Sequence, residues 1–329
     1  MRQILESNLT GVKIDHDRFA DRVMFISLSL INIASICCTI FILMFFFLNW
    51  HSLMRKVLHN HAIFLLMIVS FLYITFDLPF TIHRYRLGYD SHRTETFCLL
   101  WYWLDYSLVV VSLLLTAIAS IQRHILVFHS HWLHSYPKRW FIHYSPLIFS
   151  LIYPPVFYLI FIIFYRCEIH SDEFDHHCLH PCYSNRTILF YIDWILNTLV
   201  PVIIIVIANT ALIIRVIWSM DKVRRCRSRT WNRRQRLTLQ LLAFSILYFI
   251  GWAPSTTVAI VQMFLRPDLY KTATYLQYIH NSSYFVCPLQ PFICFFALPK
   301  LMKLMKNKIR RRRRTISAFS AFLFHDTRL

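Results

Sequence analysis

The stretch CLLWYWLDYSLVVVSLLLTAIASIQRHILVFH, residues 98–129, is a long apolar segment that holds three chemically distinct side chains at regular spacing. Asp105 follows Cys98 by seven residues, and Arg123 follows Asp105 by eighteen. At 100° per residue, both steps return to within about 20° of the starting direction, so a helix places all three on one face. At 1.5 Å per residue, Asp105 and Arg123 lie about 27 Å apart, close to the thickness of a bilayer's hydrocarbon core. Charged groups at both ends of one membrane-spanning face are costly, which favours a signalling role for this helix.

The rest of the chain has the composition of a helical membrane protein. Of its 329 residues, 57% are hydrophobic and only three are Gly, which excludes a nucleotide-binding loop and disfavours a barrel of strands. Seven apolar runs are long enough to span a membrane, at 23–48, 59–81, 97–128, 139–165, 188–218, 237–265 and 271–297. The sequence therefore predicts an all-α membrane protein with a seven-transmembrane helix bundle.

The distribution of charge predicts the orientation of the bundle. One side collects 24 of the 35 Lys and Arg residues and two acidic residues, in segments 49–60, 123–140, 215–236 and 300–329. The other side holds 11 Lys and Arg residues and 11 acidic residues. Because cytoplasmic segments are enriched in Lys and Arg, the first side is predicted to be cytoplasmic and the N-terminus extracellular. The net charge of +19 then faces the anionic lipids of the inner leaflet, and nucleic acid is not an expected partner.

The spans divide the chain into three predicted regions. An extracellular N-terminus covers 1–22 and includes the glycosylation sequon at Asn8. The seven-transmembrane domain covers 23–297, and a cytoplasmic amphipathic helix with a basic tail covers 298–329. In that last region apolar residues alternate with cations, which is typical of a short eighth helix lying on the inner leaflet. The predicted location is the plasma membrane, with multiple spans.

The cysteines indicate a covalent link on the outer side. Four of the nine Cys fall there, namely Cys98, Cys167, Cys178 and Cys182, and an even number permits two bridges. A bridge from Cys98 to Cys178 or Cys182 would fold the loop 166–187 over the mouth of the bundle. Both pairings stay open.

Several short motifs lie along the chain at characteristic positions. Cys98 is followed 25 residues later by Arg123, within Gln122-Arg123-His124. Gly251-Trp252-Ala253-Pro254 lies in the sixth span, Pro201 in the fifth, and Gln290-Pro291-Phe292-Ile293-Cys294 in the seventh. Together these residues resemble rhodopsin-like (class A) G-protein-coupled receptors across essentially the whole chain. The resemblance implies an extracellular ligand and a heterotrimeric G protein as partners, no enzymatic activity and no cofactor.

The chain departs from that family at positions that restrain the resting state. Gln122 replaces the acid that normally holds the Arg, and Arg234 stands where many members carry an acidic partner. Ser70 replaces the sodium-binding Asp, and Ile42 replaces the first-helix Asn. We therefore expect elevated basal activity. The resemblance implies a role in G-protein coupling or switching for ten residues: Gln122, Arg123, His124, Arg234, Trp252, Pro254, Pro201, Gln290, Pro291 and Cys294. The alternative for Trp252 is that it is a large aromatic side chain of the core.

The acidic residues within the spans predict the ligand side. Asp77, Asp105 and Asp193 all lie in outer halves, where no span carries Lys or Arg, so a cavity for a cationic ligand is expected. The alternative for Asp77 and Asp193 is contact with water or with Arg84 and Arg86. By resemblance, Asp105 holds the ligand's ammonium and Tyr284 helps to orient it. The predicted ligand-binding set is Asp105, Tyr284, Trp252, Asp77 and Asp193.

The type of cationic ligand stays open between an amine and a peptide. The aromatic pair that amine receptors carry in the sixth helix is replaced here by Ser255-Thr256. A basic peptide is therefore at least as plausible a ligand as a small aromatic amine.

Two other classes of membrane protein compete with a receptor. Six cytoplasmic histidines would suit a membrane enzyme with a His-bound metal, but the adjacent His pairs of such enzymes are missing there: His59, His61, His124, His129, His131 and His134. A transporter is disfavoured because no internal repeat is present. We therefore expect a receptor without a metal site.

Overall fold

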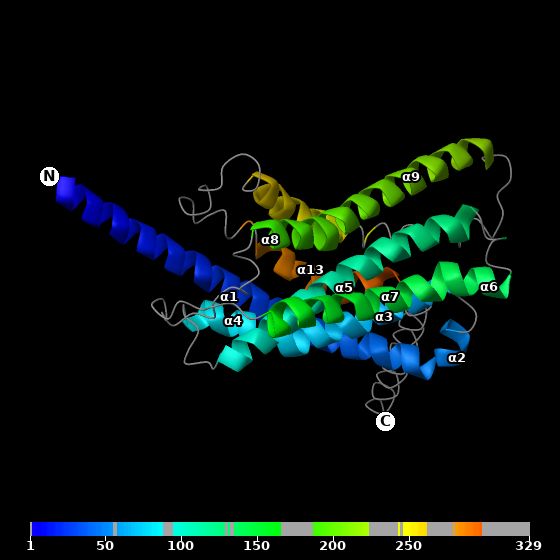
Figure 1. Cartoon of the computed structure of the whole chain (residues 1–329), viewed down its shortest axis with the longest axis horizontal. Coiled ribbons are helices and arrows are strands. Elements are labelled where there is room, and N and C mark those ends of the chain that lie inside the picture. Colours follow the sequence, from blue (N-terminus) through cyan, green and yellow to red (C-terminus); the bar gives the residue numbers. More distant parts are fainter. Residues whose placement is uncertain are drawn as a thin grey trace, which may run out of the picture.

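The computed structural model describes residues 2–54, 58–87, 95–128, 131, 135–165, 187–223, 243, 246–261, 279 and 281–297. Within these ranges the chain is helical apart from short turns, and none of the described residues forms a strand. Helices run roughly side by side in one elongated bundle, beyond which the start of α1 extends (Figure 1). The predicted all-α class is therefore confirmed.

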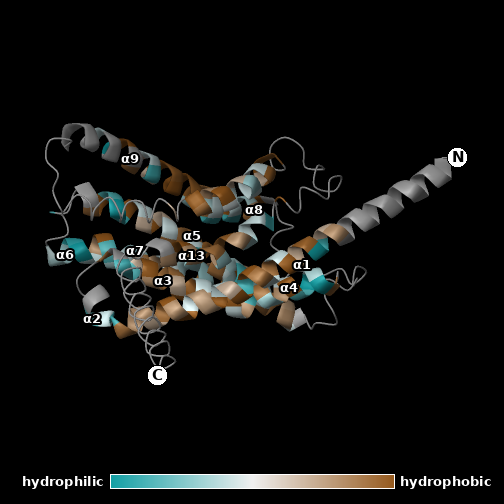
Figure 2. Cartoon of the chain, turned by 180° about the vertical axis from the view of Figure 1, so that it is seen from behind, coloured by the Kyte–Doolittle hydropathy of each residue, from teal (hydrophilic) through white to brown (hydrophobic). Residues whose placement is uncertain are grey.

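The first five predicted spans coincide with helices that are long and apolar enough to cross a membrane. These run over Phe19–Leu48, Asn60–Leu87, Thr96–Leu126, Tyr136–Phe164 and Ile188–Leu212. For the sixth predicted span the structure describes the apolar helix Ile246–Val261, and for the seventh it describes residues 279 and 281–297. Hydrophobic residues colour the middle of the bundle and hydrophilic ones gather toward the ends of several helices (Figure 2).

Two of the five spans are continuous α-helices, and the other three combine α-helices with π-helical turns. The first is α1 (Arg2–Leu48), which also carries helix through the predicted N-terminal region, and α2 (Trp50–Leu53) follows it. The second comprises α3 (His59–Leu72), η1 (Tyr73–Asp77) and α4 (Leu78–Leu87), and the third is α5 (Glu95–Phe128). The fourth comprises α6 (Tyr136–Arg139), η3 (Trp140–Tyr144), α7 (Ser145–Tyr158) and η4 (Leu159–Phe164). The fifth comprises α8 (Thr187–Asp193), η7 (Trp194–Leu199) and α9 (Val200–Val223), and η8 (Asn281–Phe285) and α13 (Val286–Ala297) belong to the seventh.

Proline explains where three of the π-helical turns lie. The turns η1, η3 and η7 each end two residues before a proline, at Pro79, Pro146 and Pro201. A proline has no N–H, and its ring pushes away the carbonyl four residues earlier, so the helix loses a regular bond there. A local widening to i→i+5 bonding accommodates that loss. The prolines therefore set the local rotation of side chains in three spans.

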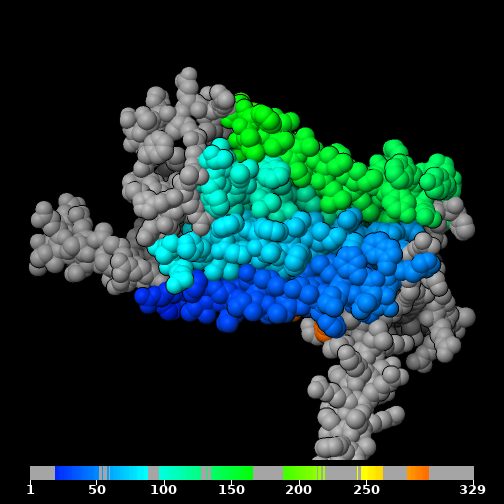
Figure 3. Space-filling model, turned by 90° about the horizontal axis from the view of Figure 1, so that it is seen from below, coloured from blue at the N-terminus to red at the C-terminus, as the bar shows by residue number. Residues whose placement is uncertain are grey.

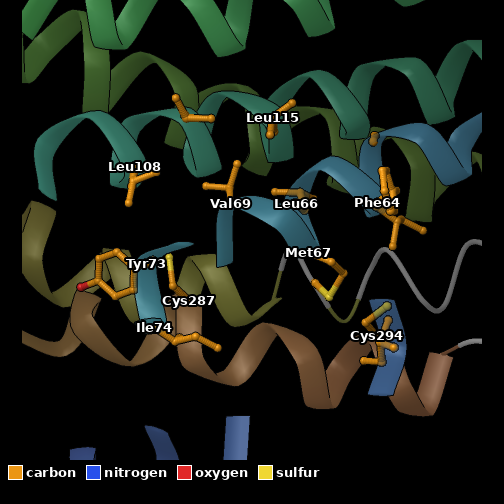
Figure 4. Close-up of a cluster of buried hydrophobic side chains, with 14 of the residues drawn as sticks. Phe64, Leu66, Met67, Val69, Tyr73, Ile74, Leu108, Leu115, Cys287 and Cys294 are labelled. Carbon is orange, nitrogen blue, oxygen red and sulfur yellow. The ribbon is translucent and has the colours of Figure 1, made fainter. Parts of the chain in front are cut away.

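The third span, α5, occupies the centre of the bundle. It packs against α3, α7 and α9, while α1 packs against α4 and α13. Figure 3 shows α1 lying along the second span on one face of the molecule. The largest core cluster joins the first, second, third, fourth and seventh spans, and Figure 4 shows part of it, including Val69, Leu108, Leu115 and Cys294.

The sides of the bundle expose large apolar side chains. Examples with at least 45% exposure lie on four different spans: Leu30, Ile33 and Phe47; Phe149 and Ile152; Ile203 and Ile207; and Ile250. Water would disfavour so much exposed apolar surface, whereas lipid covers it without penalty. The exposed surface therefore agrees with a multi-pass membrane protein.

One glycine sets the approach of the sixth span to the seventh. A Cβ atom added at Gly251 would overlap the Val286 Cγ2, and the Val286 side chain is 1% exposed. Ser282 strengthens the same contact, because its hydroxyl donates to the Gly251 carbonyl at 2.8 Å. The two helices can approach this closely only because residue 251 has no side chain.

We expect Gly251→Ala to destabilise the protein by about 1–3 kcal/mol, because the added methyl overpacks a tight contact. Thermal unfolding of the purified receptor measures the effect. Adding Val286→Ala to the variant should recover part of the lost stability, since it removes the methyl that clashes. A Gly251→Ala protein as stable as the parent would show that the helices separate without penalty.

Candidate functional site

A buried and a half-buried carboxyl group meet near the end of α5 that carries Cys98. Asp77 is the last residue of η1, is 0% exposed, and accepts a hydrogen bond from the Trp101 indole Nε1 at 2.7 Å. The Asp105 carboxyl on α5 lies within hydrogen-bonding reach of the Asp77 carboxyl. Trp101 precedes Asp105 by four residues and lies on the same face of α5, so one helix supplies both partners of Asp77.

Two tyrosines complete this group, which we call the acidic cluster: Asp77, Asp105, Trp101, Tyr73 and Tyr284. The Tyr73 and Tyr284 hydroxyls both lie within electrostatic range of the two carboxyls. The Oδ2 atom of Asp77, the Oδ1 atom of Asp105 and the Tyr73 hydroxyl are buried without a hydrogen-bond partner. Within the described part of the chain, no Lys or Arg pairs with either carboxyl.

The acidic cluster brings together three of the five predicted ligand-binding residues, Asp77, Asp105 and Tyr284. Asp77 is not placed against water, Arg84 or Arg86, because its side chain is fully buried and its hydrogen bond comes from Trp101. That alternative is therefore wrong for Asp77. Sequence reasoning missed Trp101 and Tyr73; the signal for both was a four-residue step to an acid, from Trp101 to Asp105 and from Tyr73 to Asp77.

Asp193 makes its hydrogen bonds with another set of residues. It is the last residue of α8 and 6% exposed. Its Oδ1 accepts from the Tyr158 hydroxyl at 2.8 Å and from the Asn197 amide at 2.7 Å. Two donors satisfy this carboxylate, so Asp193 has the environment of a buried structural acid.

Trp252 lies in the core between the third, fifth, sixth and seventh spans. It is 9% exposed and shares a hydrophobic cluster with Leu113, Ala117, Tyr248 and Val286. The contacts are those of a packed aromatic, and the predicted roles of Trp252 in ligand binding and switching stay predictions.

A hydrogen-bonded cluster lies one turn of the sixth span away from Trp252. The Tyr248 hydroxyl is 2.8 Å from the Ser112 hydroxyl and accepts a short hydrogen bond from the Gln290 amide. Ser112 also contacts the Cys287 sulfur at 3.6 Å, and the Ser70 hydroxyl donates to the Cys287 carbonyl at 2.8 Å. All five residues are buried. We call them the central polar cluster; it joins the second, third, sixth and seventh spans, and Tyr248, Ser112 and Cys287 were not predicted.

The remaining motif residues of the fifth, sixth and seventh spans lie inside helices. Pro201 is buried near the start of α9, and Pro254 lies within the helix Ile246–Val261. Pro291 is inside α13, and Cys294 is a free thiol with 0% exposure in the main core cluster.

At the Arg123 end of α5, Gln122 takes part in a network across three spans. Its amide nitrogen donates to the carbonyls of His143 at 2.9 Å and of Ile142 at 3.3 Å. The Ile142 carbonyl is the one that Pro146 deprives of its regular helical donor. The Gln122 Oε1 lies 2.9 Å from His143 Nδ1, and His143 Nε2 lies 3.1 Å from His61 Nδ1. Gln122 therefore links α5 to the fourth span and, through His143, to the second span. Its described hydrogen bonds go to these residues and not to Arg123.

Arg123 is buried, and among the described residues no acidic side chain balances its positive charge. The side chain is 4% exposed, and its Nε and Nη1 atoms have no hydrogen-bond partner within the described part of the chain. The neighbouring His124 has its Nε2 3.4 Å from the Arg215 guanidinium on α9. Arg234, the other predicted member of this region, lies outside the described residues.

The structure describes some of the residues named in the covalent and metal predictions. Cys98 is disulfide-bonded, while Cys178, Cys182 and Cys167 lie outside the described residues. Asn8 falls on α1, but its side chain is outside the described set. Among described residues, no group of three or more His, Cys, Asp or Glu is placed to hold a metal ion.

Comparison with known sequences identifies the family. The sequence model described as 7 transmembrane receptor (rhodopsin family) matches residues 38–294, which is more than half of the chain. No match to an individual curated protein is found. The match contains the second, third, fourth and fifth spans, the acidic cluster, the central polar cluster and Arg123. The chain therefore belongs to the rhodopsin family of seven-transmembrane receptors.

Proposed function

We propose that this receptor works at the plasma membrane, binds an extracellular cationic ligand and activates a heterotrimeric G protein. The observation that carries the proposal is the pair Asp77 and Asp105, which have no described cationic partner. Asp77 is fully buried, and Asp105 is half-buried with its Oδ1 atom shielded from solvent. Buried acids of this kind favour a positively charged group supplied from outside the protein. The ligand's ammonium or guanidinium would contact Asp105 first, with Asp77 and Tyr284 beside it.

The chemistry of the surrounding residues favours a basic peptide at least as much as a small amine. The sixth span presents Ser255 and Thr256, both buried, where amine receptors carry aromatic rings. A small amine would find little aromatic surface there, whereas a peptide side chain would bring its own apolar stem.

The proposal for the cytoplasmic side rests on Arg123. An extracellular N-terminus at 1–22 places Arg123 at the inner membrane face, where outward movement of the sixth span would open it to a G protein. The basic tail within 298–329 would lie against anionic inner-leaflet lipids, with its first part as an amphipathic eighth helix.

A screen of cationic compounds tests the ligand class directly. Cells that express the full chain and report cyclic AMP and calcium are exposed to amines and basic peptides, each with a neutral counterpart. The expected result is a concentration-dependent response to cationic compounds alone, absent in mock-transfected cells. Activation by neutral or anionic compounds, without any cationic agonist, would overturn the proposal.

We also expect signalling above the mock level without any ligand, because Arg123 has no acidic partner among described residues and Gln122 is bonded to His143. Second-messenger levels, normalised to surface expression, provide the measurement. Arg123→Ala is the matched variant and should lose this basal signal, since it removes the group proposed to contact the G protein. An unliganded receptor indistinguishable from mock-transfected cells would refute the expectation.

A further inference from the structure

We propose that Asp77 and Asp105 share one proton while the ligand site is empty, and that a cationic ligand binds by displacing it. The second half of this statement rests on the proposed function, whereas the first concerns the protein alone. The site is thus a cation site whose resting occupant is a proton.

The first argument is that the contact joins two acceptors. A carboxylate has no hydrogen to donate, so two ionised carboxyl groups within hydrogen-bonding reach repel each other. Asp77 Oδ2 and Asp105 Oδ1 are buried and receive no bond from any described donor. A proton held between the carboxyl groups converts one into a donor and turns the repulsion into a hydrogen bond.

The second argument is an unpartnered hydroxyl at the same place. Tyr73 is 1% exposed, and its hydroxyl lies near the Asp77 carboxyl without meeting the geometry of a hydrogen bond to it or to any other described residue. A buried polar group without a partner is rare in native structures and calls for an occupant or an exchangeable proton. The hydroxyl can donate to the carboxyl that stays ionised, so the site would be satisfied once one proton is present.

The third argument comes from the groups that face the pair from each neighbouring element. They are Tyr73 on η1, Trp101 on α5, Tyr284 on η8 and Cys287 on α13, and none of them carries a positive charge. Arg84 on α4 acts on the Tyr284 hydroxyl, whereas the charge that acts most strongly on Asp77 is Asp105. Since no described neighbour neutralises two negative charges, the proton is the simplest compensation.

Ligand binding at such a pair has a defined proton balance. The O–H bond between the carboxyl groups breaks, the proton passes to extracellular water, and both carboxylates become ionised. The positive charge of the ligand replaces that of the proton, so the net charge of the site is unchanged. Binding of a cation would release one proton and grow tighter as the pH rises.

Thermal unfolding of the purified receptor without ligand tests the resting proton. Between about pH 5 and pH 8 an exposed Asp has lost its proton, so the native pair holds one proton more than the unfolded chain. Stability then falls as pH rises, and we expect the Tm to drop by about 2–4 °C per pH unit more than in the variants. Asp77→Asn or Asp105→Asn should remove this extra slope and melt above the parent at pH 8, because the new amide can donate to the remaining carboxylate.

Asp193→Asn provides the matched control. It removes a carboxylate that is also buried, but one that already accepts hydrogen bonds from Tyr158 and Asn197. This variant should keep the pH slope of the parent protein. A parent slope equal to that of Asp77→Asn and Asp105→Asn would overturn the proposal.

Infrared spectroscopy gives a second reading that does not depend on variant stability. The native receptor should show the C=O stretch of a protonated carboxyl at pH 7, and that band should shift in D₂O. Absence of such a band would also overturn the proposal. Neither outcome depends on an agonist, so the shared proton can fail while the ligand role of Asp105 survives, and the reverse also holds.

Discussion

Replacing Asp105 by Asn is expected to abolish the response to a cationic agonist at the concentrations that activate the parent receptor. The change removes one full negative charge from a buried site where described residues provide no cation to take over its role. Loss of one member of a buried charge pair costs about 2–5 kcal/mol, which corresponds to a rise in EC50 of about 30-fold to several thousand-fold. Asn has nearly the shape of Asp, so packing against Asp77 is retained.

Dose–response curves of the parent and variant receptors, at matched surface expression, measure this effect. A neutral analogue of the agonist should be almost insensitive to the substitution, because it makes no ion pair. Asp193→Asn applies the same chemical change at a carboxylate bonded to Tyr158 and Asn197, and its curve should shift by no more than a few-fold. An unchanged curve for Asp105→Asn would refute the counter-ion role.

The direction of side chains along a single helix could be predicted from the sequence. The steps from Cys98 to Asp105 and Arg123 depend only on helix geometry, and the structure has all three residues on one helix, α5. The first five spans were equally accessible, because long apolar runs must form helices in lipid. Both features depend on residues close together in the sequence, so the sequence alone predicts them.

The partners of those side chains could not be predicted. Asp77 meets Asp105 across two spans, and Gln122 meets His143 and His61 across three. Such contacts depend on the rotation of one helix against another, which packing of the whole bundle determines. The π-helical turn that ends at Asp77 also rotates the side chains that follow it. A prediction that assumes a regular α-helix, with 100° per residue, does not include this rotation.

The central polar cluster leads to the second large expected effect. Replacing Tyr248 by Phe should raise basal signalling, because it removes the hydroxyl that ties the sixth span to Ser112 and Gln290. The Gln290 Oε1 is already buried without a partner, so losing its amide contact leaves that side chain unsatisfied. Each bond contributes about 1 kcal/mol, and loss of both would raise the ratio of active to resting receptor about 30-fold.

This argument requires that the bonds exist in the resting state and break when the sixth span moves outward. Ser112 and Gln290 lie on the third and seventh spans, so that movement would pull the Tyr248 hydroxyl away from both. A receptor with 1% of its molecules active would then reach about 20–25% without ligand.

Basal second-messenger output per receptor at the cell surface measures the shift, and thermal unfolding should show a lower Tm. Tyr191→Phe is the matched control, because its hydroxyl makes no hydrogen bond with any described residue. Ser112→Ala should raise the basal signal in the same direction, and combining it with Tyr248→Phe should add less than the sum, since both remove one shared bond. A fall in basal signal would instead place these bonds in the active state, because a contact stabilises whichever state contains it.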